Sequence, residues 1–472
     1  MREKARAPWR TFAFLVFVAG AVAALAATTG RASASPHVMT PASVSLVRPA
    51  GDPLPGMRGS VVFTCQTPKN AFCYGPEQIR NAYDVNPLLA AGYDGSGRTI
   101  AIIDAYGSPT IESDLALFDG VWGLPAADFH QVAPFGIDDT TADNASGWAG
   151  ETSLDVEWAH AIAPGAKILL VIAKSNNDAD ILDATQWVLD HDAGDVISQS
   201  YGEAEQCMDS TQLSRQHSLF QQLTAKGITL FASSGDQGAG SPACDTTGDQ
   251  YFKAASTPAS DPYVTGVGGT MLSAQGISGA YKSETTWNES YLGDAIAGGG
   301  GVSVVYSTPD YQRGVNGSSM RTVPDVSYNA GIYTGVITAW DGGFWLFGGT
   351  SAGSPQWAGL AAIAGQMGGH RLGLINPTLY AAAAGPNAST FLNDIADGSN
   401  NSVPNFTQDG TPDGSITGFT AVPGYDLATG LGTPVASELM PLLASGGTTT
   451  GRSYKGNERV VGHHTNGHKH HQ

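Results

Sequence analysis

Ser351 stands where a serine can become a nucleophile. The chain turns sharply at Gly348 and Gly349, and the apolar run 358–367 that follows has the length and composition of a buried helix. We therefore expect Ser351 near a helix N-terminus, where unpaired N–H groups and the helix dipole favour negative charge. A serine at such a position can also serve only as a helix cap.

The stretch 150–166 places two acids on one face of another helix. Apolar Leu154 and Trp158 recur at helical spacing, and Glu151 and Asp155 are four residues apart, hence neighbours on one face. Two like charges at this spacing destabilise an isolated helix, and a carboxylate can take the proton of a serine. The structural alternative is a solvated acidic face.

Strands that alternate with helices are expected to position these residues. The expected strands cover 99–104, 167–173, 195–200 and 228–232, and the expected helices cover 111–118, 178–191 and 210–226. Continuous apolar strands separated by helices are typical of a parallel sheet covered on both faces, so we predict a three-layer α/β fold. The region from Thr270 to Phe347 is interpreted as irregular and glycine-rich.

Ligands bind at the carboxyl ends of the strands in such sheets. The residues that follow the expected strands there are Asp104, the turn 200–202 and the stretch 233–236. These positions are therefore candidates for a site shared with Ser351.

Composition limits the partners. The 472 residues carry 23 basic and 42 acidic side chains, a formal charge of −19, which disfavours nucleic acid and anionic membrane and is compatible with an acidic environment. Basic residues, an apolar run 11–27 and a small-residue site predict a signal peptide over 1–34, with an uncleaved anchor as the alternative. We expect a protein that is secreted and monomeric.

The ends of the chain and the cysteines complete the organisation. Residues 35–71 are interpreted as a linker or short pro-segment, and 446–472 as a disordered His-rich tail, with a weak transition-metal site as the tail's alternative. Among three possible pairings of the four cysteines, proximity favours Cys65 with Cys73 and Cys207 with Cys244.

Several motifs in this order resemble the sedolisins, serine-carboxyl peptidases with a subtilisin-like fold. They are Glu151-xxx-Asp155 followed by AIAPGA, Ser-Ser-Gly-Asp at 233–236, Gly-Thr-Ser-Ala at 349–352, the opening stretch 74–83, and the stretches 258–260 and 264–270. The resemblance covers residues 72–445 and implies a single catalytic domain with a central, mostly parallel sheet.

The resemblance implies a role for four side chains. Ser351 is expected as the nucleophile, Glu151 as general base and then acid, Asp155 as the residue that orients Glu151, and Asp236 as donor to the oxyanion. A carboxylate base suits acidic pH, and an aspartate donates a hydrogen bond only when it is protonated.

Asp104 and Tyr201 are expected behind these residues. Asp104 ends its strand where subtilisins carry a catalytic aspartate. A histidine triad would need a histidine in place of Glu151, however, and His160 lies on the opposite face of that helix. The resemblance implies that Asp104 extends the hydrogen-bond network behind Glu151. Tyr201 replaces the Trp usual in the family's Ser-Trp-Gly turn, which bears on the geometry behind the catalytic residues.

The resemblance also implies one structural calcium ion. Its ligands would be the side chains of Asp394 and Asp426 and the carbonyl oxygens of Ile395, Val422 and Gly424. An ordinary loop is the alternative on the residues alone.

We therefore expect a secreted acid endopeptidase that acts on proteins or peptides. Two alternatives stay open, a tripeptidyl exopeptidase and an inactive protein that keeps the scaffold for binding. The short stretch 35–71, where relatives commonly carry a long prodomain, and the substituted Trp motivate the second alternative.

Overall fold

The computed structural model describes residues 39–41, 48–50, 62–66, 73–138, 143–244, 251–292, 295–401, 405–406, 412–413 and 416–446. These residues belong to one compact unit that covers 37–472. The predicted signal peptide over 1–34 and the predicted tail, apart from Gly446, lie outside the described residues. No helix in the described part of the chain is long and apolar enough to cross a membrane.

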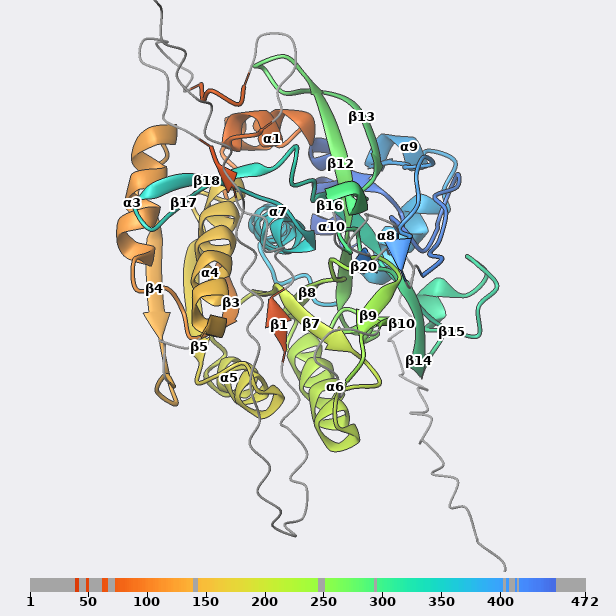
Figure 1. The fold of residues 1–472 in the computed structure, drawn as a ribbon. Helices are drawn as coiled ribbons and strands as arrows, with labels where there is room; N and C mark the ends of the chain where they lie inside the picture. Colours follow the sequence, from red (N-terminus) through yellow and green to blue (C-terminus); the bar gives the residue numbers. More distant parts are fainter. Residues whose placement is uncertain are drawn as a thin grey trace, which may run out of the picture. The chain divides into compact units, whose positions relative to one another are not determined.

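An eight-stranded sheet organises the domain (Figure 1). Its order is β13 (Ala280–Thr286), β12 (Thr265–Gln275), β8 (Thr229–Ser233), β6 (Val196–Gln199), β3 (Thr99–Ala105), β5 (Lys167–Ala173) and β4 (Asp128–Val132), with β16 (Val326–Asn329) beside β12. Neighbouring strands run parallel, except that β12 and β13 run antiparallel. The predicted mostly parallel sheet is confirmed.

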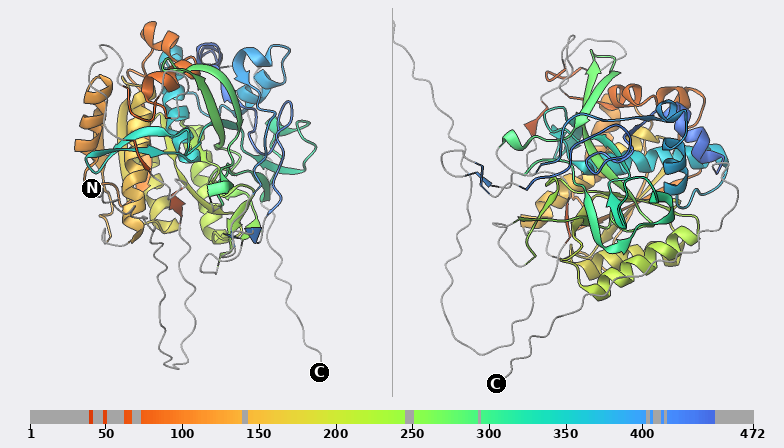
Figure 2. Two further views of the ribbon diagram at one scale, coloured as in Figure 1. Left: turned by 45° about the horizontal axis from the view of Figure 1, so that its top comes forward. Right: turned by 90° about the vertical axis from the view of Figure 1, so that its right-hand side faces the viewer.

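Helices cover both faces of this sheet because its strands are apolar on both sides. Along β3, Ile100 and Ile102 belong to one apolar cluster, and Ala101 and Ile103 belong to another, as alternation along a strand requires. The first cluster takes in α3 (Ile111–Trp122), α4 (Asp143–Ile162), α7 (Gly353–Gly368) and α10 (Ala436–Ala444), and the second takes in α5 (Asp178–His191) and α6 (Ser210–Ala225). Figure 2 shows the two layers on opposite sides of the strands.

The stretch from Thr270 to Phe347 is not irregular, so that prediction is wrong. It continues β12 and adds β13, β14 (Gly301–Ser307), β15 (Met320–Val323), β16, β17 (Val336–Trp340) and β18 (Gly343–Phe347). Asp341 and Gly342, with φ of 50° and 71°, connect β17 to β18 in a two-residue hairpin. An Asp-Gly pair between apolar runs is a hairpin signal.

The described parts of the stretch 35–71 lie against the domain. β1 (Thr40–Pro41) pairs with β7 (Tyr201–Ala204), and β2 (Arg48–Pro49) pairs with β18. Phe63 is fully buried. The domain boundary near residue 72 stays a prediction.

Both predicted disulfides are confirmed. Cys65 bonds to Cys73 with 5.8 Å between their Cα atoms, and Cys207 bonds to Cys244 with 5.1 Å. Short elements fill the remaining connections: α1 (Pro76–Ala82), α2 (Asn86–Ala90), α8 (Asn376–Ala383), α9 (Ala388–Phe391), β9 (Gly240–Pro242), β10 (Tyr251–Lys253), β11 (Ser256–Thr257), β19 (Leu392–Asn393), β20 (Asn405–Phe406), β21 (Pro412–Asp413) and β22 (Thr433–Pro434).

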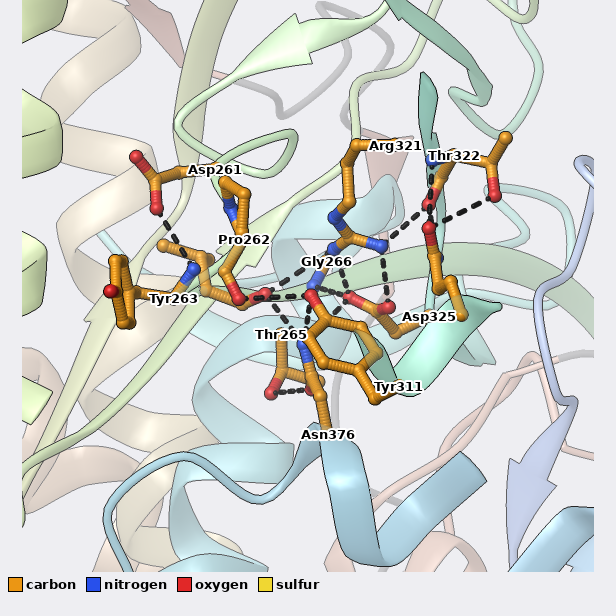
Figure 3. A network of polar contacts seen from close by, with 12 residues as sticks. Asp261, Pro262, Tyr263, Thr265, Gly266, Tyr311, Arg321, Thr322, Asp325 and Asn376 are labelled. Atoms are coloured by element: carbon orange, nitrogen blue, oxygen red, sulfur yellow. Dashed lines mark hydrogen bonds and ion pairs between the residues drawn. The ribbon is translucent and has the colours of Figure 1, made fainter. Parts of the chain in front are cut away.

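A buried ion pair ties several of these elements together (Figure 3). The two guanidinium nitrogens of Arg321 lie 2.7 and 2.5 Å from the two carboxylate oxygens of Asp325, and both side chains are fully buried. Asp325 also accepts hydrogen bonds from the Tyr380 hydroxyl of α8, at 2.8 Å, and from the backbone N–H of Gly266 in β12, at 2.8 Å. Its carbonyl oxygen accepts from the N–H of Leu431 at 2.8 Å, which fixes the nearby C-terminal loop.

Candidate active site

Ser351 lies in a short 3-10 turn, η3 (Thr350–Ala352), that leads directly into α7. Gly349 enters this turn with φ of 95°, a backbone conformation that residues other than glycine rarely adopt. The Ser351 side chain is fully buried, and its Oγ donates a long hydrogen bond of 3.4 Å to the carbonyl oxygen of Ser200. The expected place near a helix N-terminus is confirmed, with one 3-10 turn in between.

Helix α4 carries Glu151 and Asp155 and packs against the turn that contains Ser351. Both side chains are fully buried, and α4 packs against α7 and η3. The Ser200 hydroxyl donates to Asp155 Oδ1 at 2.8 Å, so Ser200 connects Asp155 with Ser351. The two acids therefore face the interior of the protein, and the solvated acidic face considered for this helix is wrong.

Asp104, at the end of β3, completes a group of three buried carboxyls with Glu151 and Asp155. Burial raises the pKa of Asp104 well above its usual range, and the charge of Glu151 raises it further. Burial also raises the pKa of Asp155, to which the charges of Asp104 and Glu151 add, whereas the hydrogen bond from Ser200 lowers it. Because the three carboxyls are buried close together, ionising one of them disfavours ionising the others, and their titration belongs to the group rather than to one residue.

Asp236 contacts Thr350, the residue that precedes Ser351. It follows β8, and its Oδ1 accepts hydrogen bonds from the backbone N–H of Thr350 at 2.7 Å and from the Thr350 hydroxyl at 2.8 Å. Burial raises the pKa of Asp236, an effect that these two hydrogen bonds oppose and the charge of Glu151 reinforces. Its Oδ2 is buried and has no hydrogen-bond partner among the described residues. A protonated Asp236 can thus offer an O–H group next to Ser351.

Tyr201 packs beside Trp148, whereas His160 contacts the backbone of Pro125. The Tyr201 hydroxyl donates to Gln199 Oε1 at 3.1 Å, and its ring packs on Trp148 with 5.8 Å between centroids. Burial raises the pKa of Tyr201, and the charges of Asp104 and Asp155 add to this effect. The Nε2 of His160 lies 2.9 Å from the carbonyl oxygen of Pro125, which agrees with its exclusion from a triad.

Ser200 and Thr350 make contacts that the sequence did not predict. Ser200 was flagged only as part of a turn, and Thr350 only as part of a motif. No spacing in the chain connects Thr350 to Asp236, 114 positions away. The sole signal was a polar residue directly beside each expected site residue.

The five predicted calcium ligands meet on two adjoining loops: Asp394, Ile395, Val422, Gly424 and Asp426. Asp426 Oδ1 accepts from the N–H groups of Ala428 and Thr429, both at 2.8 Å, and its Oδ2 accepts from Val422 at 3.1 Å.

The oxygen atoms that these residues offer are of the kinds that bind calcium. Asp394 Oδ2 accepts from the N–H of Gly424 at 2.9 Å, so the two carboxylates approach the same loop. Carboxylate and carbonyl oxygens are the ligands that calcium prefers. Among the described residues there is no group of three or more acidic, histidine or cysteine side chains suited to a metal. Carbonyl oxygens would have to complete the ligand set.

The sequence of the chain is similar to those of known peptidases. Residues 142–371 match the model of the subtilase family. The chain is 33% identical over 382 residues to kumamolisin from Bacillus sp. (strain MN-32), covering 78% of this chain and 63% of that protein. It is 30% identical over 316 residues to tripeptidyl-peptidase 1 from Mus musculus, covering 62% of this chain and 51% of that protein. The chain thus spans about half to two thirds of the length of these relatives.

A solved structure extends the similarity to three dimensions. Pseudomonas sedolisin, a serine-carboxyl proteinase complexed with two molecules of pseudo-iodotyrostatin, superimposes with a TM-score of 0.68 at 28% identity. The match covers 80% of this chain and 99% of that one, which confirms the predicted subtilisin-like fold. By its motifs, its fold and these relatives, the chain belongs to the sedolisin family.

Proposed function

We propose that the protein is a secreted serine-carboxyl endopeptidase that hydrolyses proteins or peptides at acidic pH. The observation that carries the proposal is the buried hydrogen-bond network that connects Ser351 and its neighbour Thr350 with two carboxyl groups. Ser200 connects Ser351 with Asp155, and Thr350 holds Asp236. Membership of a peptidase family supports the same class of reaction.

The proposed reaction begins with proton transfer from the Ser351 hydroxyl to the Glu151 carboxylate. Ser351 Oγ then forms a bond to the substrate carbonyl carbon, and the developing oxyanion accepts a hydrogen bond from protonated Oδ2 of Asp236. Glu151 passes its proton to the leaving amine as the C–N bond breaks, which leaves an acyl group on Ser351. Water activated by Glu151 then hydrolyses this ester and regenerates the serine.

Two groups in this reaction need opposite protonation states. Glu151 must be ionised to act as a base, and Asp236 must be protonated to donate. Burial supports the protonated form of Asp236. The raised pKa values of Asp104 and Asp155 favour their protonated, neutral forms. Glu151 can then carry the single negative charge of the buried group. Both needs are met together at acidic pH.

A tripeptidyl exopeptidase is the second candidate, because several relatives carry that name. The two activities differ in their products. An endopeptidase cuts internal bonds of an unfolded protein, whereas a tripeptidyl peptidase releases tripeptides from a free N-terminus.

We also propose a structural calcium ion held by the side chains of Asp394 and Asp426 and the carbonyl oxygens of Ile395, Val422 and Gly424. A bound calcium ion would supply positive charge that joins the two loops. The ion has no part in bond cleavage. The rest of the proposal is a secreted monomer, and the two disulfides support secretion because such bonds persist in oxidising compartments.

Mass spectrometry tests the proposal directly. Purified protein is incubated at about pH 4, where a carboxylate base is partly ionised, with reduced, unfolded casein and, separately, with a peptide aldehyde. We expect internal cleavage of casein and a covalent aldehyde adduct that maps to Ser351 and is absent from the Ser351→Ala variant. Release of tripeptides alone would favour the second candidate. Folded protein with neither cleavage nor adduct would favour the inactive scaffold.

A further inference from the structure

The connection that carries Asp236 is an irregular loop. Residues 234–239, the Asp236 loop, join the end of β8 at Ser233 to the start of β9 at Gly240. Thr350 holds the Asp236 carboxyl. The backbone of an irregular connection keeps one conformation only where other segments of the chain hold it. The position of the Asp236 side chain therefore depends on the segments that lie against this loop.

Residues 297–300, the glycine stretch, hold the Asp236 loop through backbone hydrogen bonds. The N–H of Ala297 donates to the carbonyl oxygen of Asp236 itself at 2.9 Å. The N–H of Gly299 donates to the carbonyl oxygen of Gly235 at 2.6 Å. These two bonds fix the backbone at Asp236 and at the residue before it, so the glycine stretch determines where the Asp236 side chain begins.

The glycine stretch lies too close to its neighbours for side chains at two of its positions. A Cβ atom on Gly299 would lie 2.0 Å from the carbonyl oxygen of Ser234. A Cβ atom on Gly300 would lie 2.0 Å from the carbonyl oxygen of Leu427. Both distances are far shorter than a non-bonded contact of about 3.5 Å. The glycine stretch therefore cannot shift without displacing the Asp236 loop or the loop that contains Leu427.

Asn400 joins the glycine stretch to the Asp236 loop. Its side chain is fully buried, and its Nδ2 donates to the carbonyl oxygen of Gly298 at 3.1 Å. Its Oδ1 accepts from the N–H of Phe419 at 2.7 Å, which orients the amide with its nitrogen toward the glycine stretch. The backbone carbonyl oxygen of Asn400 accepts from the N–H of Ala239, the last residue of the Asp236 loop, at 3.0 Å. One residue thus supports both segments.

We propose that Asn400 is a positioning residue for the Asp236 carboxyl, acting through the glycine stretch and through the backbone of Ala239. The proposal rests on the proposed function, in which Asp236 donates to the oxyanion. A donor stabilises the developing charge best when it is already in place as the charge forms. Displacing it by about 1 Å lowers the rate by up to about 100-fold. Binding of uncleaved substrate changes little, because the oxyanion exists only after attack.

Steady-state kinetics of Asn400→Ala in the full chain give the first test, with a quenched fluorescent peptide at acidic pH. We expect kcat to fall by about tenfold to 100-fold while KM changes by less than about twofold. Asn401→Ala is the matched control, because the exposed side chain of Asn401 accepts only from the backbone, from the Gly418 N–H at 2.8 Å. This control should keep the kcat and KM of the wild type. Wild-type kcat in Asn400→Ala would overturn the proposal.

A double-mutant cycle with Asp236→Ala separates positioning of Asp236 from a general structural role. If Asn400 acts through Asp236, adding Asn400→Ala to Asp236→Ala should lower kcat by less than about twofold, because the group that it positions is already absent. A general structural role predicts the same loss of kcat in both backgrounds. An equal loss, in variants that thermal melting shows to be folded, would overturn the proposal.

Hydrogen exchange gives a readout that needs no catalysis. The Gly238 amide, which donates to Ala297 at 2.8 Å, and the Ala239 amide should be protected in the unchanged chain. Both should exchange about threefold to tenfold faster in Asn400→Ala, the effect of one lost hydrogen bond, and at the parent rate in Asn401→Ala. Unprotected amides in the unchanged chain, or equal exchange in folded Asn400→Ala, would overturn the proposal. If exchange responds as expected while the wild type cleaves no peptide, the proposed function fails and the support of the Asp236 loop by Asn400 stands.

Discussion

Replacing Asp236 by asparagine separates its proposed role as a donor from a role as a charge. The structure holds Oδ1 of Asp236 on the Thr350 N–H at 2.7 Å and leaves Oδ2 buried without a partner among the described residues. In Asp236→Asn the amide oxygen can keep the Thr350 bonds while the NH₂ group takes the position of Oδ2. An amide donates at every pH, whereas the carboxyl donates only while protonated.

The sign of the pH effect follows from the raised pKa. Asp236 is protonated below its folded pKa, which burial raises, so the donor is lost as pH rises through that value. We expect Asp236→Asn to keep kcat within about tenfold of the wild type at acidic pH, as for the exchange of one hydrogen-bond donor for another. The decline at higher pH that Asp236 causes should disappear. Asp236→Ala removes the donor and should lower kcat by about 100- to 1,000-fold.

Steady-state cleavage of a quenched fluorescent peptide from about pH 3 to 8 measures both variants, since this range spans the titration of ordinary and shifted carboxyls. Circular dichroism and thermal melting provide the check that each variant is folded. The reasoning would be refuted if folded Asp236→Asn were as inactive as Asp236→Ala at acidic pH. Wild-type activity in Asp236→Ala would equally refute it.

Three further predictions concern stability. Burial and then the charge of Asp178 raise the pKa of Glu203 to about 9, so the folded protein binds a proton there that the unfolded chain releases above about pH 4.3. The free energy of unfolding should therefore fall as pH rises from about 4 to 9. Urea titrations of Glu203→Gln should show a dependence of this free energy on pH that is smaller by at most about 1.4 kcal/mol per pH unit. The same pH dependence in Glu203→Gln and the wild type would contradict this. Removing calcium should lower the melting temperature of the wild type but not of a variant with Asp394→Ala and Asp426→Ala, and equal melting of calcium-free and calcium-loaded wild type would reject the site. Arg321→Met leaves a buried carboxylate unpaired and should cost about 3–5 kcal/mol in urea unfolding, with a smaller loss when Asp325→Asn is added.

The central layers could be predicted because their sequence signals are local. Strand β5 and helix α5 begin and end at the predicted residues, since a continuous apolar run and a helical period need no knowledge of partners. The hairpin of β17 and β18 was not predicted, although Asp341-Gly342 marks its turn, because the glycines around it suggest irregular structure. A strand of two residues such as β1 carries no local signal, and only its pairing with β7 defines it.

In the candidate site, too, the residues in local motifs could be predicted, and the contacts between distant segments could not. The motifs placed Ser351, Glu151 and Asp236 on elements that the structure brings together, although their roles stay predictions. The contacts through Ser200 and Thr350 depend on how segments over 100 positions apart approach each other, and no spacing in the chain encodes that approach. Burial of the acids on α4 likewise depends on the packing of α7 and η3 against that helix.

The pH dependence of casein cleavage tests the account most directly, measured for the wild type beside Ser351→Ala and Glu151→Gln. We expect a maximum below about pH 5 in the wild type and loss of cleavage in both folded variants. A maximum near neutral pH, or activity that survives in Glu151→Gln, would contradict the assignment of a carboxylate base to Ser351.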